Sequence, residues 1–138
     1  MIAACGTSFH AGMFGARMMR MLKSFKTVQV MDAAEVDTHD LPQSAKGGLL
    51  VISQSGETKD VMRTLKLALD RDIPCMSVVN SVGSTVARTS RCGVYLNAGR
   101  EVAVASTKAF TSQATVLSQI AIWFAQVWKD IDWYGARF

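Results

Sequence analysis

Short apolar runs alternate with longer segments of helical periodicity along this chain of 138 residues. The runs that predict strands are MIAAC, TVQVMDA, LLVIS, CMSVVN and CGVYLN. Between them the periodicity predicts helices over about residues 8–24, 56–71 and 106–128, with a short helix before the last strand. Strands that alternate with helical crossovers indicate a parallel sheet. We therefore expect an α/β fold, a three-layer α/β/α sandwich with a mainly parallel sheet of about five strands.

The first predicted helix carries most of its large apolar residues on one face. That face consists of Phe14, Met18, Met21, Leu22 and Phe25. Met13 and Met19 fall off it. Near the end of the last helix, further aromatic residues crowd together, namely Trp123, Phe124 and Trp128. This excess of apolar surface indicates an interface with another domain, with a wider core as the alternative.

The second long helix has clearly marked features. Val61, Leu65 and Leu69 recur every four residues and form its predicted apolar face. Glu57 and Asp60 stand at its expected start, where negative charge complements the helix dipole. These positions predict an amphipathic helix that packs on the sheet.

Composition and charge limit the class of protein. Hydrophobic residues make up 49% and charged residues 19% of the chain, which is typical of one compact globular domain. The formal net charge of +4 could attract an acidic partner such as nucleic acid. The basic residues, however, are spread over helix faces and interspersed with aspartates, as on an ordinary solvated surface. We therefore expect no nucleic-acid partner.

The cysteine pattern and the apolar segments favour a cytoplasmic protein without membrane contact. Cys5, Cys75 and Cys92 are odd in number and far apart, so neither a disulfide framework nor a zinc site is indicated. The N-terminus has no basic flank and no long apolar core, unlike a signal peptide. Polar residues interrupt the most apolar span, residues 114–128, which falls short of the about 20 residues that a membrane helix needs.

Small polar residues gather where strands are expected to end and helices to begin. The clusters are CGTS (5–8), SQSGET (53–58), NSVGS (80–84) and ASTK (105–108). In an open parallel sheet these positions share one edge, where ligands bind. Helix-start amides, hydroxyls and the close backbone approach that Gly6 and Gly56 permit would recognise a phosphate, or a carboxylate, through neutral donors. The alternative is that these residues only form helix caps and turns.

Several motifs give the chain a family resemblance. They are ACGTSFHAG, SQSGET, NSVGS, NAG followed by Glu101, and VASTKAFTSQ, over roughly residues 3–115. With them the chain resembles the sugar isomerase (SIS) domain, and within it the first SIS domain of glutamine–fructose-6-phosphate transaminases (isomerising), also called glucosamine-6-phosphate synthases. SQSGET alone is typical of phosphosugar-binding domains, whereas VASTKAFTSQ is more particular to the transaminases. The resemblance implies a flavodoxin-like fold.

The resemblance also implies that the polar clusters bind fructose 6-phosphate or glucosamine 6-phosphate. Together with Gly6 and Gly56, the residues of the predicted site are Thr7, Ser8, Ser53, Gln54, Ser55, Thr58, Val104, Ala105 and Ser106. Their hydroxyls and amides would hold the phosphate and the neighbouring sugar hydroxyls. Arg100 and Ala103 depart from the commoner family residues, with Ala103 standing where glycine is usual. The path of that loop is therefore the least determined part of the prediction.

The family's enzyme has an N-terminal glutaminase domain followed by two SIS domains, and this chain resembles only the first SIS domain. We therefore expect residues 1–138 to be a single phosphosugar-binding domain from a longer two-SIS enzyme of hexosamine synthesis. Its expected partners are the second SIS domain, the glutaminase domain and a second copy in a homodimer. In this family the acid–base residues belong to the second SIS domain and the tail, so no catalytic residue is expected here. The alternative is a stand-alone SIS domain that senses a sugar phosphate and regulates a partner.

Other candidate chemistry is weaker. Cys5 and His10 could form a nucleophile and its base, but Cys5 ends an apolar strand and is more simply a packed thiol. His39 lies beside two aspartates, yet such a loop is usually only solvated, so no metal is expected. Glu57 and Glu101 could act as acids, although a glutamate in a first helical turn is more often a dipole partner. Neither GxxxxGK[ST] nor GxGxxG occurs, and no cofactor is expected.

Overall fold

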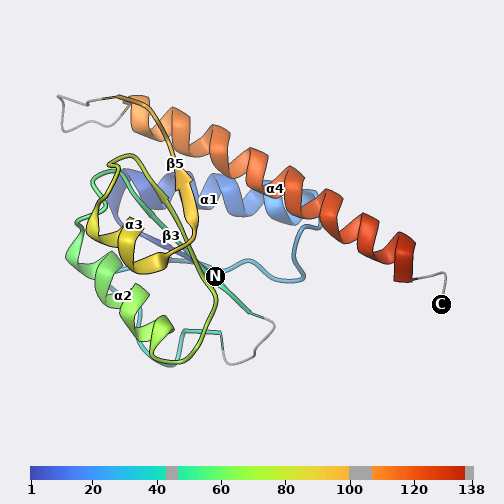
Figure 1. Ribbon diagram of the computed structural model, residues 1–138, viewed down its shortest axis with the longest axis horizontal. Coiled ribbons are helices and arrows are strands. Elements are labelled where there is room, and N and C mark those ends of the chain that lie inside the picture. The colour runs from blue at the N-terminus through green and yellow to red at the C-terminus, as the bar shows by residue number, and fades with distance from the viewer. Residues whose placement is uncertain (43–46, 100–106, 136–138) are drawn as a thin grey trace.

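The computed structural model describes residues 1–42, 47–99 and 107–135, with side chains up to residue 127 (Figure 1). Its elements, in chain order, are β1 (Ile2–Ala4), α1 (Gly6–Met21), β2 (Val30–Asp32), β3 (Leu49–Ser53), α2 (Lys59–Leu69), β4 (Cys75–Val79), α3 (Thr85–Ser90), β5 (Gly93–Tyr95) and α4 (Thr107–Gly135). Strands and helices thus alternate as the apolar pattern predicts. The last helix is longer than expected, and Figure 1 shows its end projecting beyond the sheet.

The strands form one sheet in the order β2-β1-β3-β4-β5, and every neighbouring pair is parallel. This is the strand order of flavodoxin-like folds. Helices α1 and α4 cover one face, and α2 and α3 cover the other (Figure 1). The predicted three-layer α/β/α fold with a five-stranded parallel sheet is confirmed.

The central strand β3 explains why the sheet is covered on both faces. All of its residues are buried, and successive side chains point to opposite faces of a strand. Leu50 and Ile52 join the core under α1 and α4, whereas Leu49 and Val51 join the core under α2 and α3. A strand with one solvated face would alternate apolar and polar residues, so the unbroken apolar run required two helical layers.

The predicted apolar face of α1 is partly wrong, because Met18 and Phe25 pack against the core whereas Phe14, Met21 and Leu22 are exposed. Phe14 is 42% exposed and Met21 is 66% exposed, whereas Met19, which the periodicity left off the face, is only 3% exposed. The buried face consists mostly of small residues, namely Ser8, Ala11, Gly12, Gly15, Ala16 and Met19. A Cβ atom added to Gly15 would lie 2.9 Å from Leu117 Cβ in α4. The close approach of α1 to α4 therefore selects small residues and turns the large ones outward.

Helix α2 largely follows its prediction. Val61 and Leu65 are fully buried against the sheet, while Leu69, at the end of the helix, is exposed. The helix begins at Lys59 rather than near Gly56, because the preceding residues form a turn. Within the described residues, no helix is long and apolar enough to cross a membrane.

Candidate functional site

The strand order reverses between β1 and β3, and this switch point positions the candidate site. β1 connects through α1 to β2 on one side, whereas β3 connects through α2 to β4 on the other. Open α/β sheets bind ligands at such a point, beyond the carboxyl ends of the strands. Gly6, Thr7 and Ser8 follow β1 and residues 53–58 follow β3, so the structure brings two of the predicted clusters to this edge.

The cluster after β4 lies directly against the cluster after β3. Asn80 N donates a hydrogen bond to Gln54 O at 3.2 Å, and Val86 N donates to Gly56 O at 3.0 Å. Backbone hydrogen bonds therefore fasten residues 80–86 to the SQSGET turn. Val104, Ala105, Ser106 and Glu101 lie outside the described residues.

The hydroxyls of the SQSGET turn accept hydrogen bonds from its own backbone. Ser53 Oγ accepts from Gly56 N at 3.0 Å, and Ser55 Oγ accepts from Glu57 N at 3.2 Å. Ser53 Oγ also shares a hydrogen bond of 3.1 Å with Thr58 Oγ1. Ser53 is buried, whereas Gln54, Ser55 and Thr58 are half-buried. Because Ser55 Oγ is an acceptor here and has no acceptor of its own among the described residues, its O–H remains free to donate.

The alternative that these polar residues serve as helix caps does not hold at the N-cap positions. Cys5 of α1, Thr58 of α2 and Ser84 of α3 make no side-chain capping hydrogen bond. Thr58 Oγ1 instead bonds to Ser53, and Ser84 Oγ is buried without a partner among the described residues. Ser53 and Ser55 do stabilise the turn, so that part of the alternative is correct. The starts of α1 and α2 consequently keep amide groups that no N-cap side chain occupies.

Gly56 allows the SQSGET turn to press against the next loop. Its φ is +66°, in the left-handed region that favours glycine. A Cβ atom added there would lie 2.5 Å from Ser84 Cβ and closer still to Ser84 Oγ. Gly6, at the start of α1, also has a positive φ of +56°, but the space around it is open. A ligand can therefore approach the backbone at Gly6, whereas Gly56 serves packing within the protein.

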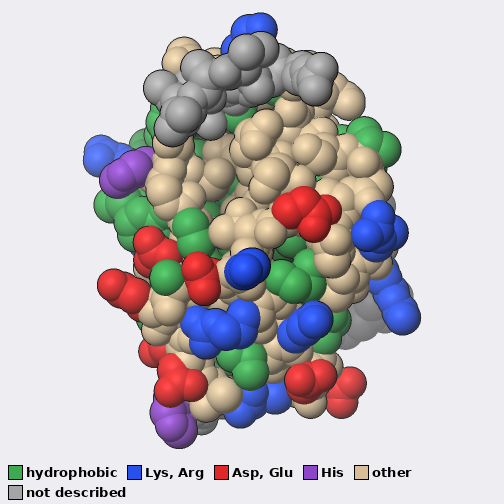
Figure 2. Space-filling view, turned by 90° about the vertical axis from the view of Figure 1, so that its left-hand side faces the viewer, with side chains coloured by type: hydrophobic (Ala, Val, Ile, Leu, Met, Phe, Trp, Pro, Cys, Tyr) green, Lys and Arg blue, Asp and Glu red, His purple; other side chains and the backbone are tan. Residues whose placement is uncertain are grey.

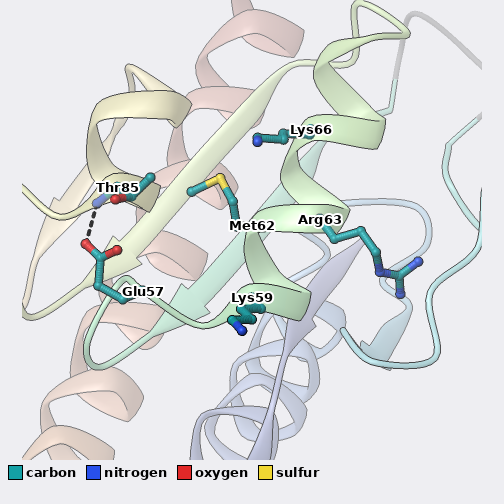
Figure 3. A pocket seen from close by; sticks show the side chains of 6 residues that line it. All are labelled: Glu57, Lys59, Met62, Arg63, Lys66 and Thr85. Atoms are coloured by element: carbon teal, nitrogen blue, oxygen red, sulfur yellow. Dashed lines mark hydrogen bonds between the residues drawn. The ribbon is translucent and has the colours of Figure 1, made fainter.

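Glu57 stabilises a different helix from the one expected. Its carboxylate accepts a hydrogen bond from Thr85 N, the first residue of α3, at 2.7 Å (Figure 3). That N–H donor, followed by the side chain of Thr85, lowers the pKa of Glu57. The expectation that Glu57 complements the dipole of α2 is wrong, because α2 begins two residues later. Glu57 instead links the SQSGET turn to α3.

Ser8 lies under the first turn of α1 and has a partner far along the chain. Its Oγ accepts a hydrogen bond from Gln113 Nε2 of α4 at 2.9 Å. Ser8 is buried, while Thr7 and Gly6 beside it are exposed. Gln113 closes the VASTKAFTSQ motif but was not among the predicted residues of the site.

Asn80 belongs to the predicted cluster NSVGS, but its hydrogen-bond partners were not predicted. Its Nδ2 donates to Gly99 O at 2.8 Å, and its Oδ1 accepts from Ala98 N at 2.9 Å. Both hydrogen bonds fix the NAG segment beside the end of β4. The available signal was an asparagine directly after a buried strand, a position where its side chain can bond to backbone in place of the sheet ladder.

The structure gives Cys5 a packing role. Burial, followed by a hydrogen bond to the Asp32 carboxylate, raises the pKa of the Cys5 thiol to about 11. A thiol with so high a pKa is a poor nucleophile at neutral pH. His10 is exposed and makes an edge-on ring contact with Phe9. Within the part of the chain that the structure describes, no group of three or more His, Cys, Asp or Glu side chains could hold a metal ion, and this includes the surroundings of His39.

A cavity of about 370 Å³ lies between α2 and α3. Its lining consists of Glu57, Lys59, Met62, Arg63, Lys66 and Thr85. Figure 2 shows blue side chains near the middle of this face of the molecule, and Figure 3 shows Arg63 pointing away from Lys66. Arg63 donates to the carbonyl oxygens of Ala33 and Ala34. None of the predicted phosphosugar residues lines this cavity, although Glu57 of the SQSGET turn does.

The profile of the SIS domain family matches residues 1–123 of the sequence. The chain belongs to the SIS domain family. The predicted resemblance is therefore confirmed at the level of the domain.

Glutamine–fructose-6-phosphate aminotransferases (isomerizing) are among the proteins similar to this SIS domain. The enzyme of Chlorobaculum tepidum is 44% identical over 122 residues, which cover 88% of this chain and 20% of the relative. The enzyme of Rattus norvegicus is 39% identical over 121 residues, which cover 88% of this chain and 18% of the relative. The chain thus spans about a fifth of the length of the curated relatives it matches.

A solved structure shows the same fold at recognisable sequence identity. The C-terminal domain of glucosamine-fructose-6-phosphate aminotransferase from Francisella tularensis is 32% identical and superposes with a TM-score of 0.84. The match covers 91% of this chain and 35% of that domain. Sequence and structure therefore agree on a SIS domain similar to those of the aminotransferases.

Proposed function

We propose that this SIS domain binds a sugar phosphate at the switch point between β1 and β3. The observation that carries the proposal is the convergence of two helix starts, at Gly6 and Lys59, whose N-cap side chains make no capping hydrogen bond. Amide groups and dipoles at helix starts attract anions without any lysine or arginine. Ser55 and Ser8 accept hydrogen bonds from the protein and so have O–H groups left to donate. Such a set of neutral donors suits a phosphate.

The sugar phosphates we propose are fructose 6-phosphate and glucosamine 6-phosphate. Support comes from the names of the relatives, which act on fructose 6-phosphate, and from their identity across 88% of this chain. The domain would form the substrate-binding half of an isomerase module in hexosamine synthesis. Its partners would be a second SIS domain, a glutaminase domain and a second copy of the enzyme, in the cytoplasm.

In this function the described residues bind and orient the substrate. Proton transfer between sugar carbons needs a positioned acid and base with suitable pKa values. Hydroxyls, amides and backbone N–H groups dominate the edge of the sheet, and the carboxylate of Glu57 is already engaged with Thr85 N. Thr7, Ser8, Ser53, Gln54, Ser55 and Thr58 would accordingly hold the phosphate and sugar hydroxyls, with Val104, Ala105 and Ser106 as proposed neighbours. A stand-alone sensor of sugar phosphates would use the same binding residues.

The test compares sugars with and without phosphate. Calorimetric titration of the chain with fructose 6-phosphate, glucosamine 6-phosphate, fructose and glucosamine should give binding only for the phosphorylated sugars. Because a hydrogen bond to a charged group contributes about 1.5–3 kcal/mol, Ser55→Ala should weaken that binding by about tenfold to more than a hundredfold. Thr115→Ala serves as the matched control, since its hydroxyl is exposed on α4 and, among the residues that the structure describes, bonds only to Thr111 O.

Thermal melts of the same variants separate binding from folding. Ser55→Ala also removes the acceptor of Glu57 N, which should lower stability by only about 1 kcal/mol. Unchanged affinity together with a lowered melting temperature would show that the serine only stabilises the turn. Equal affinity for fructose and fructose 6-phosphate would likewise rule out a phosphate site.

A further inference from the structure

The buried side-chain amide of Gln113 makes a hydrogen bond through its nitrogen but not through its oxygen. Gln113 is 1% exposed, and its Nε2 donates to Ser8 Oγ at 2.9 Å. Its Oε1 is buried and has no hydrogen-bond partner among the described residues. A buried acceptor without a donor destabilises a fold, and native proteins hold few such atoms. A methionine or leucine would fill the same space without that cost, so the amide needs a reason beyond packing.

The hydrogen bond from Gln113 fixes what Ser8 can do. A hydroxyl has one hydrogen and two lone pairs, and the Gln113 N–H occupies one lone pair. The hydrogen of Ser8 must therefore point elsewhere, and no described residue accepts it. Accepting a hydrogen bond also polarises the hydroxyl and makes it a stronger donor. Ser8 stands in the first turn of α1, beside the exposed Gly6 and Thr7.

This polarity of the hydrogen bond follows from the orientation of the Gln113 amide. With the amide turned over, Oε1 would accept from Ser8, and both N–H groups would face the position that now has no partner. In the structure, one N–H of the amide donates to Ser8 Oγ, and only the acceptor Oε1 occupies the position that has no partner. In the turned orientation Ser8 would spend its hydrogen on the protein and could offer an anion nothing but lone pairs.

We propose that Gln113 is a positioning residue that holds the Ser8 hydroxyl as a donor to the phosphate of a bound sugar phosphate. This inference rests on the proposed function and assigns part of its affinity to a residue of α4. The ligand class is a phosphate ester, because only a strong acceptor gains from a hydroxyl whose hydrogen is kept free. Gln113 acts through Ser8 and makes no contact with the ligand itself.

A double-mutant cycle tests the coupling. Fructose 6-phosphate is titrated by calorimetry into the unmodified chain, Gln113→Met, Ser8→Ala and the double variant. Gln113→Met should weaken binding by about two- to tenfold, the effect of losing one neutral hydrogen bond. It should have no further effect once Ser8 is alanine. Gln119→Met is the matched control, since this exposed amide lies on the same helix and should leave affinity unchanged.

A second variant covers the case in which Gln113→Met does not fold. Gln113→Glu keeps the size of the side chain, and at a pH high enough to ionise the buried carboxyl group it can only accept hydrogen bonds. It should draw the Ser8 hydrogen away from the ligand and place negative charge near the phosphate, so binding should weaken by more than about tenfold. Unchanged affinity in either variant, or an equal loss with and without Ser8, would overturn the inference.

A measurement without ligand separates this inference from the proposed function. The side-chain amide signals of Gln113 can be identified in an ¹⁵N NMR spectrum because they disappear in Gln113→Met. They should shift and exchange faster with water in Ser8→Ala. If these signals ignore Ser8→Ala while fructose 6-phosphate still binds, the inference alone is wrong. If they respond but the unmodified chain binds no sugar phosphate, the proposed function fails and takes the ligand part of the inference with it.

Discussion

Replacing Gly56 by alanine should destabilise the domain by an amount that can be divided into two parts. The backbone at Gly56 has a φ of +66°, and a left-handed conformation costs a residue with a Cβ about 1–2 kcal/mol. The new Cβ would also lie 2.5 Å from Ser84 Cβ and 3.6 Å from Val79 Cγ1. Overpacking of this kind adds about 1–3 kcal/mol. The free energy of unfolding should therefore fall by about 2–5 kcal/mol.

Two further variants isolate the parts. Gly83 has a similar φ of +71°, but a Cβ there would meet nothing within 4 Å, so Gly83→Ala should show the backbone cost alone. Adding Ser84→Gly to Gly56→Ala should recover most of the overpacking cost, because it removes both atoms that crowd the new methyl group. The hydroxyl of Ser84 has no partner among the described residues, so this rescue breaks no hydrogen bond.

Thermal melts with urea titrations provide the assay. A loss of 1 kcal/mol lowers the melting temperature of a domain of this size by about 3 °C, so Gly56→Ala should melt about 6–15 °C lower. Gly83→Ala should melt about 3–6 °C lower. If Gly56→Ala and Gly83→Ala melt at the same temperature, or if Ser84→Gly does not restore stability, Ser84 does not crowd position 56. The tight contact described between the two loops would then be refuted.

Three other predictions concern charge, thiols and surface. Glu57→Gln should lower the free energy of unfolding at neutral pH and make it depend less on pH in the acid range. The hydrogen bond from Thr85 N holds the pKa of Glu57 below its ordinary value of 4.5. The ionised carboxylate therefore stabilises the fold above that pH, and this stabilisation is lost as the pH falls through the lowered pKa. Denaturant titrations from pH 3 to pH 7 check this, and parallel curves for both proteins would contradict it. Exposed Cys92 should be alkylated by iodoacetamide long before Cys5, whose thiol reacts readily only as the pH approaches about 11, and mass spectrometry of time points would reveal the opposite order. The exposed side chains of Phe14 and Trp123 should promote self-association. Light scattering should therefore give a lower average mass for the double variant Phe14→Ser, Trp123→Gln than for the unmodified chain, and equal masses would refute this association.

The sequence predicts the place of the site better than its internal contacts. Apolar runs and helical periods decide the order of strands and helices, and that order alone puts the polar clusters at one edge of the sheet. The partners of the side chains depend on which helices meet in space. Ser8 and Gln113 are 105 residues apart, and the partner of Glu57 is the amide of Thr85, 28 residues away. The local spacing of residues therefore does not predict such pairs.

The errors in the predicted apolar face of α1 arise for the same reason, because they also depend on which elements meet in space. Periodicity places the largest apolar residues in the core, because burying more area is more favourable. However, Gly15 is buried against α4 and Gly12 is buried against the sheet, and neither position has room for a side chain. A helix squeezed between a sheet and a second helix selects for small volume, and Phe14 is then left outside. A run of small residues at helical spacing was the available signal.

The packing of α1 against α4 also dictates an order of events in folding. α1 is synthesised before α4, and β2, β3, α2, β4, α3 and β5 lie between them in the chain. Until α4 docks, the small residues of α1 that contact α4 and the neighbouring face of the sheet are exposed to solvent. Contacts between helices so far apart in the chain form slowly. Ser8 also lacks its amide partner during that interval. The ligand binding that we propose for Ser8 would therefore require that α4 has already docked on α1. Before that step, the partly folded domain exposes apolar surface, which favours aggregation or chaperone binding.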